Sequence, residues 1–283
     1  MLDLIFFFYI CKNNVLLAMN DHIHPYKEKH SVKEAVISFY VQHNDITPDS
    51  FRKLLMVEGP VSSFYQKFEP VKEVSVDIAL GKETKVSRLQ DAGFKLTGFK
   101  DGKTAKVLQC FNQPMQTVFT FNELEYTRWD DYLKVSLDTA NQIAGLLPDR
   151  KLMAYNLLYI DEFYFDQGAS YSAKDLFNFE SRTLPKGLED SPLVDYHLVL
   201  NKNTGNLGYS DSLNIKVLDA DMRKTIRIIH SVTFPMTIGI GWLDFLKSED
   251  VVKLLNYAHQ SNKKLLSDIL NKDIAKEIGL CVY

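Results

Sequence analysis

Residues 151–166, KLMAYNLLYIDEFYFD, form the segment of the sequence that is most informative about the fold. Its odd-numbered positions are mainly aromatic or aliphatic: Met153, Tyr155, Leu157, Tyr159, Asp161, Phe163 and Phe165. Its even-numbered positions include further apolar residues: Leu152, Ala154, Leu158, Ile160 and Tyr164. Because successive side chains of a strand point to opposite faces of its sheet, both faces of this segment are apolar. We therefore predict a strand at the centre of a sheet, covered on both faces.

The composition predicts a globular chain with a large core. Of the 283 residues, 46% are hydrophobic and 12% aromatic, which suits one large α+β domain or two fused subdomains. The net charge of −3 gives no general attraction to nucleic acid, so we expect no such partner. The cysteines, Cys11, Cys110 and Cys281, are too few and too far apart for a disulfide framework or a closed zinc site. We expect a cytoplasmic protein with no cofactor or metal, and a small buried thiol at Cys110.

Residues 1–31 are interpreted as a leader and flexible segment. Their apolar runs are shorter than the roughly 18 to 20 residues of a membrane-spanning helix, and they lack the basic start of a signal peptide. We expect translation to begin at Met19, with a short membrane-associated leader as the alternative. The segment also holds three histidines, interpreted as part of a solvated tail rather than metal ligands: His22, His24 and His30. The organised protein is expected to begin at Val32.

The first half, residues 32–150, reads as strand, helix, antiparallel strands and long helix. Strands are expected at 32–42, 71–80, 93–99, 104–111 and 115–121. Thr47 and Pro48 mark a helix start, followed after Gly59-Pro60 by a second helical piece at 61–68. Asp101-Gly102 predicts a tight hairpin turn. A long helix follows, with Thr127 as its cap.

The second half, residues 151–283, repeats that order. After the central strand come a short helix capped by Ser170 or Ser172, strands at 194–200, 213–218 and 223–234, and one or two helical pieces from Trp242. Trp129-Asp130-Asp131-Tyr132 in the first half corresponds to Trp242-Leu243-Asp244-Phe245 in the second. We interpret the fold as α+β with two similar halves, which an internal pseudo-duplication would explain. Chance agreement between two common α+β patterns is the alternative.

Four segments carry a resemblance to a known family. They are EAVISFYV in the first strand, QTVFTFNELEYTRWDDYL before the long helix, LLYIDEFYF in the central strand and W-x-D-F at Trp242. With them the chain resembles, from Val32 to Gly279, a sporadically distributed family of uncharacterised prokaryotic proteins. Family members often carry an arginine in the central strand, where this chain has Asp161-Glu162. The resemblance implies no settled activity or cofactor, and its patchy distribution is associated with mobile-element and phage-defence loci.

The candidates for chemistry are few. The sequence has no glycine-rich phosphate loop, G-x-S-x-G elbow, H-E-x-x-H or paired C-x-x-C motif. Asp161 shares its face with Tyr and Phe, so its carboxyl group should be paired or have a raised pKa. It is either a general acid or ligand anchor beside Tyr159, Glu162 and Tyr164, or a structural carboxylate.

Three further residues, like Asp161, have both a structural and a functional interpretation. His230 lies on an apolar strand face and is either a core histidine or a catalytic one. Trp129 and Trp242, at helix starts, are either packing anchors or stacking platforms for a ligand. The lysines of the last helix alternate with acids, which is typical of a solvated face.

The leading functional prediction is a non-enzymatic recognition protein. It would bind a protein partner or small ligand between the halves, within a phage-defence or mobile-element locus, through groups such as Tyr159, Tyr164, Trp129 and Trp242. The alternative is a hydrolytic or nuclease-like enzyme, which requires Asp161, Glu162 and His230 to converge. A further alternative, nucleic-acid binding without catalysis, requires a one-sided basic surface.

Overall fold

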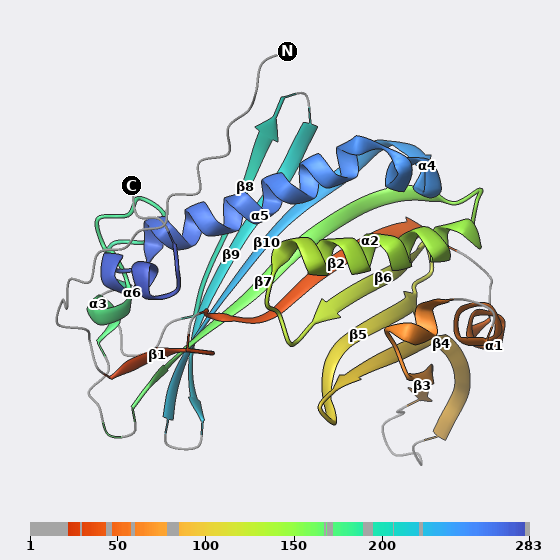
Figure 1. The fold of residues 1–283 in the computed structure, drawn as a ribbon, viewed down its shortest axis with the longest axis horizontal. Helices are drawn as coiled ribbons and strands as arrows, with labels where there is room; N and C mark the ends of the chain where they lie inside the picture. Colours follow the sequence, from red (N-terminus) through yellow and green to blue (C-terminus); the bar gives the residue numbers. More distant parts are fainter. Residues whose placement is uncertain are drawn as a thin grey trace.

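A single antiparallel sheet organises the protein (Figure 1). The computed structural model describes residues 22–28, 30–43, 47–57, 60–77, 85–166, 168, 172–188, 195–205, 207–220 and 223–280. Ten described strands form the sheet in the order β3-β4-β5-β6-β2-β7-β10-β9-β8, with β1 beside β7. The expected α+β class is confirmed. The predicted start at Met19 and most of the predicted leader lie outside the described residues.

From β2 onward, the first half has the expected order of strand, helix, antiparallel strands and long helix. Its elements are β1 (Ile23–Pro25), β2 (Val32–Gln42), α1 (Pro48–Arg52), the π-helix η1 (Lys53–Val57), the 3-10 helix η2 (Pro60–Ser63), β3 (Lys67–Asp77), β4 (Lys85–Lys100), β5 (Lys103–Asn112), β6 (Gln116–Glu123) and α2 (Trp129–Gly145).

The second half follows the same order. Its elements are β7 (Lys151–Phe165), α3 (Ala173–Leu176), β8 (Asp195–Thr204), β9 (Leu207–Ala220), β10 (Arg223–Gly241), α4 (Trp242–Lys247), α5 (Glu249–Ile269) and α6 (Lys272–Glu277). The strands β8, β9 and β10 are longer than predicted. The β8–β9 ladder continues past the apolar runs into polar residues, and β10 continues past an irregularity after Pro235 to Gly241, where it pairs again with β7.

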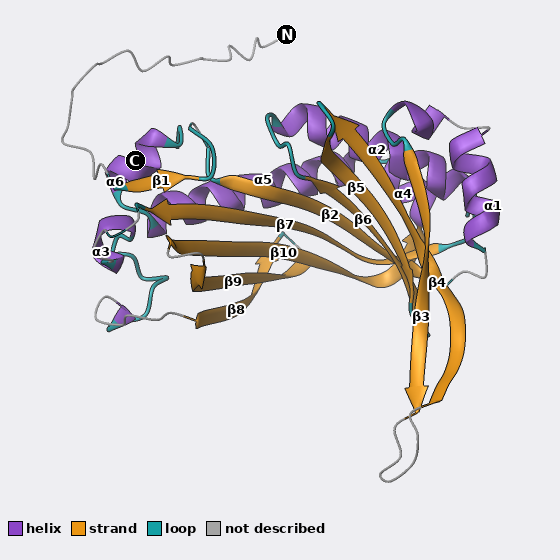
Figure 2. Ribbon diagram, turned by 90° about the horizontal axis from the view of Figure 1, so that it is seen from below, coloured by secondary structure: helices purple, strands orange, loops and turns teal. Residues whose placement is uncertain are grey.

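The strand β7 lies at the centre of the sheet, as predicted. Leu157 pairs with Ile37 of β2 on one side and with Val232 of β10 on the other. The prediction that both faces are covered was wrong. The helices α2 and α5 lie over one face (Figure 2), where Tyr155 and Tyr159 are buried, whereas Leu158 on the opposite face is only half-buried. An antiparallel sheet can leave one face open, and apolar side chains on that face shield one another across strands.

The two halves meet at the β2–β7 pair. In each half the first strand pairs with the last one, β2 with β6 and β7 with β10, and the remaining strands step outward to the edges β3 and β8. Each tryptophan packs against the other half. The Trp242 ring lies 5.9 Å from the Phe39 ring and 5.0 Å from the Phe119 ring, and the Trp129 ring lies 6.5 Å from the Tyr159 ring. These contacts belong to a hydrophobic cluster that spans both halves, and a second cluster lies around α3 and α6 with residues of β7, β9 and β10.

Local signals in the sequence differ in how well they predict the structure. Asp101 and Gly102 both have positive φ, 51° and 74°, as a two-residue hairpin turn requires. The Thr47 side chain caps α1 as predicted, by accepting a hydrogen bond from the Ser50 amide. The predicted cap at Thr127 was wrong, because α2 begins one residue later, after Arg128, and that position has no side-chain cap.

Two segments depart from the predicted element types. Helical structure ends at Ser63 and β3 begins at Lys67, so the prediction of helix over 61–68 was wrong at its end. In the segment expected to be flexible, β1 pairs with the end of β7, with Ile23 opposite Phe165. Ile23 is 1% exposed, and the burial of this side chain explains why residues before Val32 join the sheet. No helix in the described part of the chain is long and apolar enough to cross a membrane.

Candidate functional site

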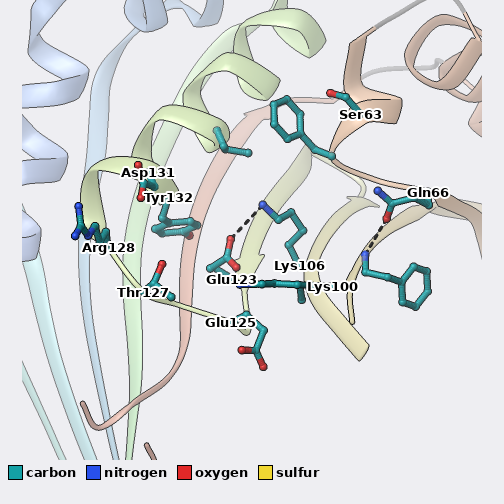
Figure 3. A pocket seen from close by; sticks show the side chains of 14 residues that line it. Ser63, Gln66, Lys100, Lys106, Glu123, Glu125, Thr127, Arg128, Asp131 and Tyr132 are labelled. Atoms are coloured by element: carbon teal, nitrogen blue, oxygen red, sulfur yellow. Dashed lines mark hydrogen bonds and ion pairs between the residues drawn. The ribbon is translucent and has the colours of Figure 1, made fainter. Parts of the chain in front are cut away.

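A pocket of about 330 Å³ opens beside the first turn of α2 (Figure 3). Its volume is at the lower end of the range for small-ligand sites. It is lined by residues of η2 and the following loop, of β4, β5 and β6, of the loop between β6 and α2, and of α2: Ser63, Phe64, Gln66, Phe99, Lys100, Ala105, Lys106, Glu123, Glu125, Thr127, Arg128, Asp131, Tyr132 and Val135. The whole lining belongs to the first half of the chain, whereas the predicted binding site lay between the halves.

The lining includes one lysine–glutamate pair in its half-buried part. Lys106 of β5 and Glu123 of β6 are directly opposite in the ladder, and Lys106 Nζ lies 3.6 Å from Glu123 Oε2. Their side chains are 22% and 12% exposed. Since 3.6 Å exceeds hydrogen-bond distance, neither group fully satisfies the other. Burial raises the pKa of Glu123, and the nearby Lys106 only partly opposes that rise.

Aromatic rings form the walls of the pocket. The Phe64 ring centroid lies 5.9 Å from Lys106 Nζ, within the range of a cation–π contact. Tyr132 is buried, and its hydroxyl group is fixed by donating to the Phe121 carbonyl oxygen at 2.7 Å. The Phe99 amide donates to Gln66 Oε1 at 2.8 Å, which holds the loop after η2 against the end of β4. The walls are therefore positioned before any ligand arrives.

The charges at the pocket rim are unevenly paired. Glu125 accepts a hydrogen bond from Lys27 at 2.9 Å, and this bond lowers the pKa of Glu125. Among the described residues, Lys100 and Arg128 form no ion pair, and both are exposed. Asp131 lies in the first turn of α2. Counting only the described residues, the rim therefore presents two cations and one carboxylate that form no ion pair.

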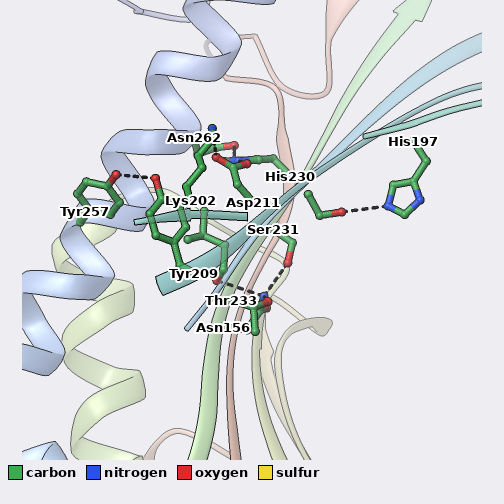
Figure 4. A network of polar contacts seen from close by, with 12 residues as sticks. Asn156, His197, Lys202, Tyr209, Asp211, His230, Ser231, Thr233, Tyr257 and Asn262 are labelled. Carbon is green, nitrogen blue, oxygen red and sulfur yellow. Dashed lines mark hydrogen bonds and ion pairs between the residues drawn. The ribbon is translucent and has the colours of Figure 1, made fainter. Parts of the chain in front are cut away.

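The predicted residue His230 belongs to a separate, buried network (Figure 4). Its Nε2 lies 2.8 Å from Asp211 Oδ1 of β9, and its Nδ1 lies 3.0 Å from Asn262 Oδ1 of α5. Lys202 of β8 donates to the other oxygen of Asp211 at 2.7 Å. His230 is 1% exposed, so these contacts tie three strands to α5 beneath the helix layer.

Asp161 and Glu162 lie on opposite faces of β7. Asp161 is fully buried on the helix-covered face, where Ser31 donates to its Oδ1 at 2.7 Å. Burial raises the pKa of Asp161 to about 6, although the Ser31 bond and His230 oppose the rise. Glu162 is on the other face, bonded to Arg227 at 2.7 Å. The structure therefore brings Asp161 and His230 to one face and keeps Glu162 away from both.

The hydrogen bonds around Glu162 explain why its pKa is lowered, whereas the pKa of Asp161 is raised. Burial favours its neutral form, but hydrogen bonds from Lys33, Tyr164 and Arg227 outweigh burial and lower the pKa of Glu162. The Lys33 and Tyr164 bonds measure 2.9 and 2.8 Å. Tyr164, predicted as a ligand contact, thus holds a carboxylate on the open sheet face.

The remaining predicted contacts are packed inside the protein. The Tyr159 hydroxyl lies 2.8 Å from His259 Nδ1, and the Trp129 ring stacks on the His259 ring at 4.5 Å. Trp242 is fully buried. Tyr159, Trp129 and Trp242 do not line the pocket.

Sequence reasoning missed the residues that do line the pocket, although a signal was present. Lys106 shares its strand face with Leu108 and Cys110, and Glu123 shares its face with Phe119 and Phe121. A single charge at the end of a buried stripe, in each of two strands, suggests a cross-strand pair once their register is known.

The described residues contain no group of three or more histidines, cysteines and carboxylates placed to hold a metal ion. Comparisons with protein-family models, with curated proteins and with solved structures found no match to this chain.

Proposed function

We propose that this protein is a non-enzymatic recognition protein that binds a small organic molecule in the pocket between α2, β5 and β6. The Lys106–Glu123 pair carries the proposal. A part-buried cation and carboxylate are costly to desolvate, and their attraction offsets that cost only when the hydrogen-bond geometry is good. At 3.6 Å the pair is incomplete, and a ligand that hydrogen-bonds to both groups would complete it.

The surroundings of the pair support a small ligand over a nucleic acid. The lining carries three bases, Lys100, Lys106 and Arg128, and three acids, Glu123, Glu125 and Asp131. A surface that binds a phosphate backbone presents an excess of bases, because neutralised phosphates supply most of the affinity. Fixed aromatic walls with a few polar groups are typical of small-molecule sites.

The alternative of a hydrolytic enzyme has weaker support. It requires Asp161, Glu162 and His230 around one accessible point. Asp161 is 0% and His230 1% exposed, and Glu162 lies across the sheet from both. We therefore assign Asp161 and His230 to the stability of the fold.

We also propose that the two halves are a duplicated unit. The support is the shared strand order outward from the β2–β7 pair and the reciprocal packing of the two tryptophans. The family resemblance and a role in phage defence stay predictions.

The pocket can be tested by blocking it. Val135 lines the pocket from α2, and Val135→Trp would fill it, whereas Val252→Trp changes a 39% exposed residue on α5 outside the lining. We expect a fragment screen by NMR to find small molecules that shift the backbone amide signals of Ala105 and Lys106. Those shifts should vanish in Val135→Trp and persist in Val252→Trp. Fragments that bind equally well to both variants would place recognition elsewhere and refute the proposal.

A further inference from the structure

We infer that the ligand is a small organic anion whose acidic group binds Lys106 in place of Glu123. This inference rests on the proposed function and names the ligand class of the same pocket. A proton taken up by Glu123 accompanies the exchange, so that binding strengthens as the pH falls.

The balance of paired and unpaired charges favours an anion. Glu125 is already neutralised by Lys27 at 2.9 Å, and Glu123 faces Lys106. The described groups left without an ion pair at the rim are Lys100, Arg128 and the single carboxylate of Asp131. The approaching ligand therefore meets a net positive rim, and such a field favours negative molecules.

Lys106 is the group best placed to receive the anion. An ammonium group has three N–H donors, and the contact with Glu123 at 3.6 Å occupies at most one of them. The Lys106 side chain is only 22% exposed, so a charge-assisted hydrogen bond there is weakly screened by solvent. The oxygens of a carboxylate or phosphate group fit this requirement.

Glu123 is the group that takes up a proton when the anion binds. The titratable groups around it are Lys106 on β5, Glu125 beyond β6, Tyr132 on α2 and Tyr65 before β3. Of these, only Lys106 is a cation, and the ligand would engage it. A second negative charge beside Glu123 disfavours its ionised form, which burial already disfavours. Binding of the anion is thus linked to the uptake of one proton by Glu123.

The walls indicate the body of the ligand. Phe64 and Phe99 with the buried Tyr132 present flat apolar surfaces, and about 330 Å³ suits a molecule with a single ring system. An aromatic or similarly flat anion matches both the walls and the charges.

Four probes of the same shape test the charge. Benzoate, phenyl phosphate, benzamide and benzylamine would be titrated into the full chain at millimolar concentration and followed by NMR. We expect benzoate or phenyl phosphate to bind and benzamide and benzylamine to bind at least about tenfold more weakly, because the charge-assisted bond is lost. The stronger of the two anions identifies the acidic group. Lys106→Met should abolish the preference, whereas Lys134→Met, at an exposed pair on α2, should leave it unchanged.

The linked proton gives a second, independent readout. As the pH falls toward the raised pKa of Glu123, the affinity for benzoate should rise, by at most about tenfold per pH unit, the limit for one proton. Glu123→Gln should bind benzoate more tightly at pH 8 and with a flat pH profile.

Three outcomes contradict the proposals in different ways. Stronger binding of benzylamine or benzamide would overturn the anion assignment and leave a small-molecule site in place. Benzoate binding that does not depend on pH in the wild-type protein would overturn the role of Glu123. Failure of all four probes and of the wider fragment screen would contradict the proposed function itself.

Discussion

The effects of two buried groups, Asp161 and His259, on the pH dependence of stability should cancel, because their pKa values are shifted in opposite directions. The Asp161 pKa is raised from its ordinary value of 3.8 to about 6 by burial. The His259 pKa is lowered from 6.5 to about 4 by burial, with Lys263 adding to the effect. As the pH falls from 6.5 to 4, the folded protein gains a proton at Asp161 that the unfolded chain does not bind. Over the same range the unfolded chain gains a proton at its histidine that the folded protein does not bind.

The magnitudes are nearly equal. Asp161 contributes stability that is fully present below pH 3.8 and is lost as the pH rises through about 6, which amounts to about 3 kcal/mol at 1.36 kcal/mol per pH unit. His259 contributes stability that is fully present above pH 6.5 and is lost as the pH falls through about 4, again about 3 kcal/mol. Together these two groups should leave the free energy of unfolding almost flat between pH 4 and 6.5.

Single substitutions should reveal how each group alone changes the free energy of unfolding with pH. In Asp161→Asn only the histidine effect remains, so the free energy of unfolding should fall by about 3 kcal/mol as the pH drops from 6.5 to 4. In His259→Gln only the aspartate effect remains, and stability should rise by a similar amount. The double variant should be flat again. Urea unfolding at several pH values across this range measures all four profiles.

A flat profile in Asp161→Asn would contradict the lowered pKa of His259, because it would mean that the folded protein and the unfolded chain bind the histidine proton equally well. A flat profile in His259→Gln would mean that Asp161 keeps its charge in the folded protein, stabilised by His230 and Ser31 more strongly than burial opposes it. The two variants therefore test the two groups separately.

Three further predictions concern the fold. Glu162→Gln should lower the free energy of unfolding at pH 7 by about 1 to 3 kcal/mol, because the lowered pKa of Glu162 stabilises the fold only where the carboxylate is ionised. The variant and the wild type should converge in acid, as urea unfolding at pH 7 and at acid pH would measure. A difference that stays the same at both pH values would contradict this prediction. Trp129→Phe should destabilise the protein by about 1 kcal/mol more than Trp242→Phe in thermal unfolding. The reason is that Trp129 Nε1 donates to Asn256, whereas Trp242 Nε1 has no partner among the described residues. Equal losses of stability in the two variants would contradict this prediction. Gly102→Val should destabilise by at least about 1 kcal/mol in urea unfolding, because φ is 74° there, and Lys103→Val is the control at the neighbouring residue.

Much of the fold was predictable because its signals are local. The alternation of apolar residues in 151–165 predicts the central strand, and Asp101-Gly102 predicts the turn between β4 and β5. The open sheet face was not predictable. The half-burial of Leu158 and Ile160 depends on which helices pack where, and an apolar side chain in the sequence is the same on either face.

The pocket was less predictable than the fold. Lys106 and Glu123 are 17 positions apart, and only the β5–β6 register brings them together. Asp161, by contrast, drew attention through its aromatic neighbours, and its raised pKa agrees with the expectation for a buried carboxylate. The aromatic residues around Asp161 in the sequence predict that its side chain is buried. Structural and functional carboxylates can both be buried, so the neighbouring residues alone could not separate the two roles.

Native mass spectrometry of the full chain, purified gently from cells, would show whether the protein carries a small molecule in its pocket. If the pocket between α2, β5 and β6 is a ligand site, the wild-type protein and Val252→Trp should carry a bound small molecule, and Val135→Trp should not. The released molecule should be an anion. A wild-type protein with no bound molecule, or the same adduct on Val135→Trp, would contradict the account.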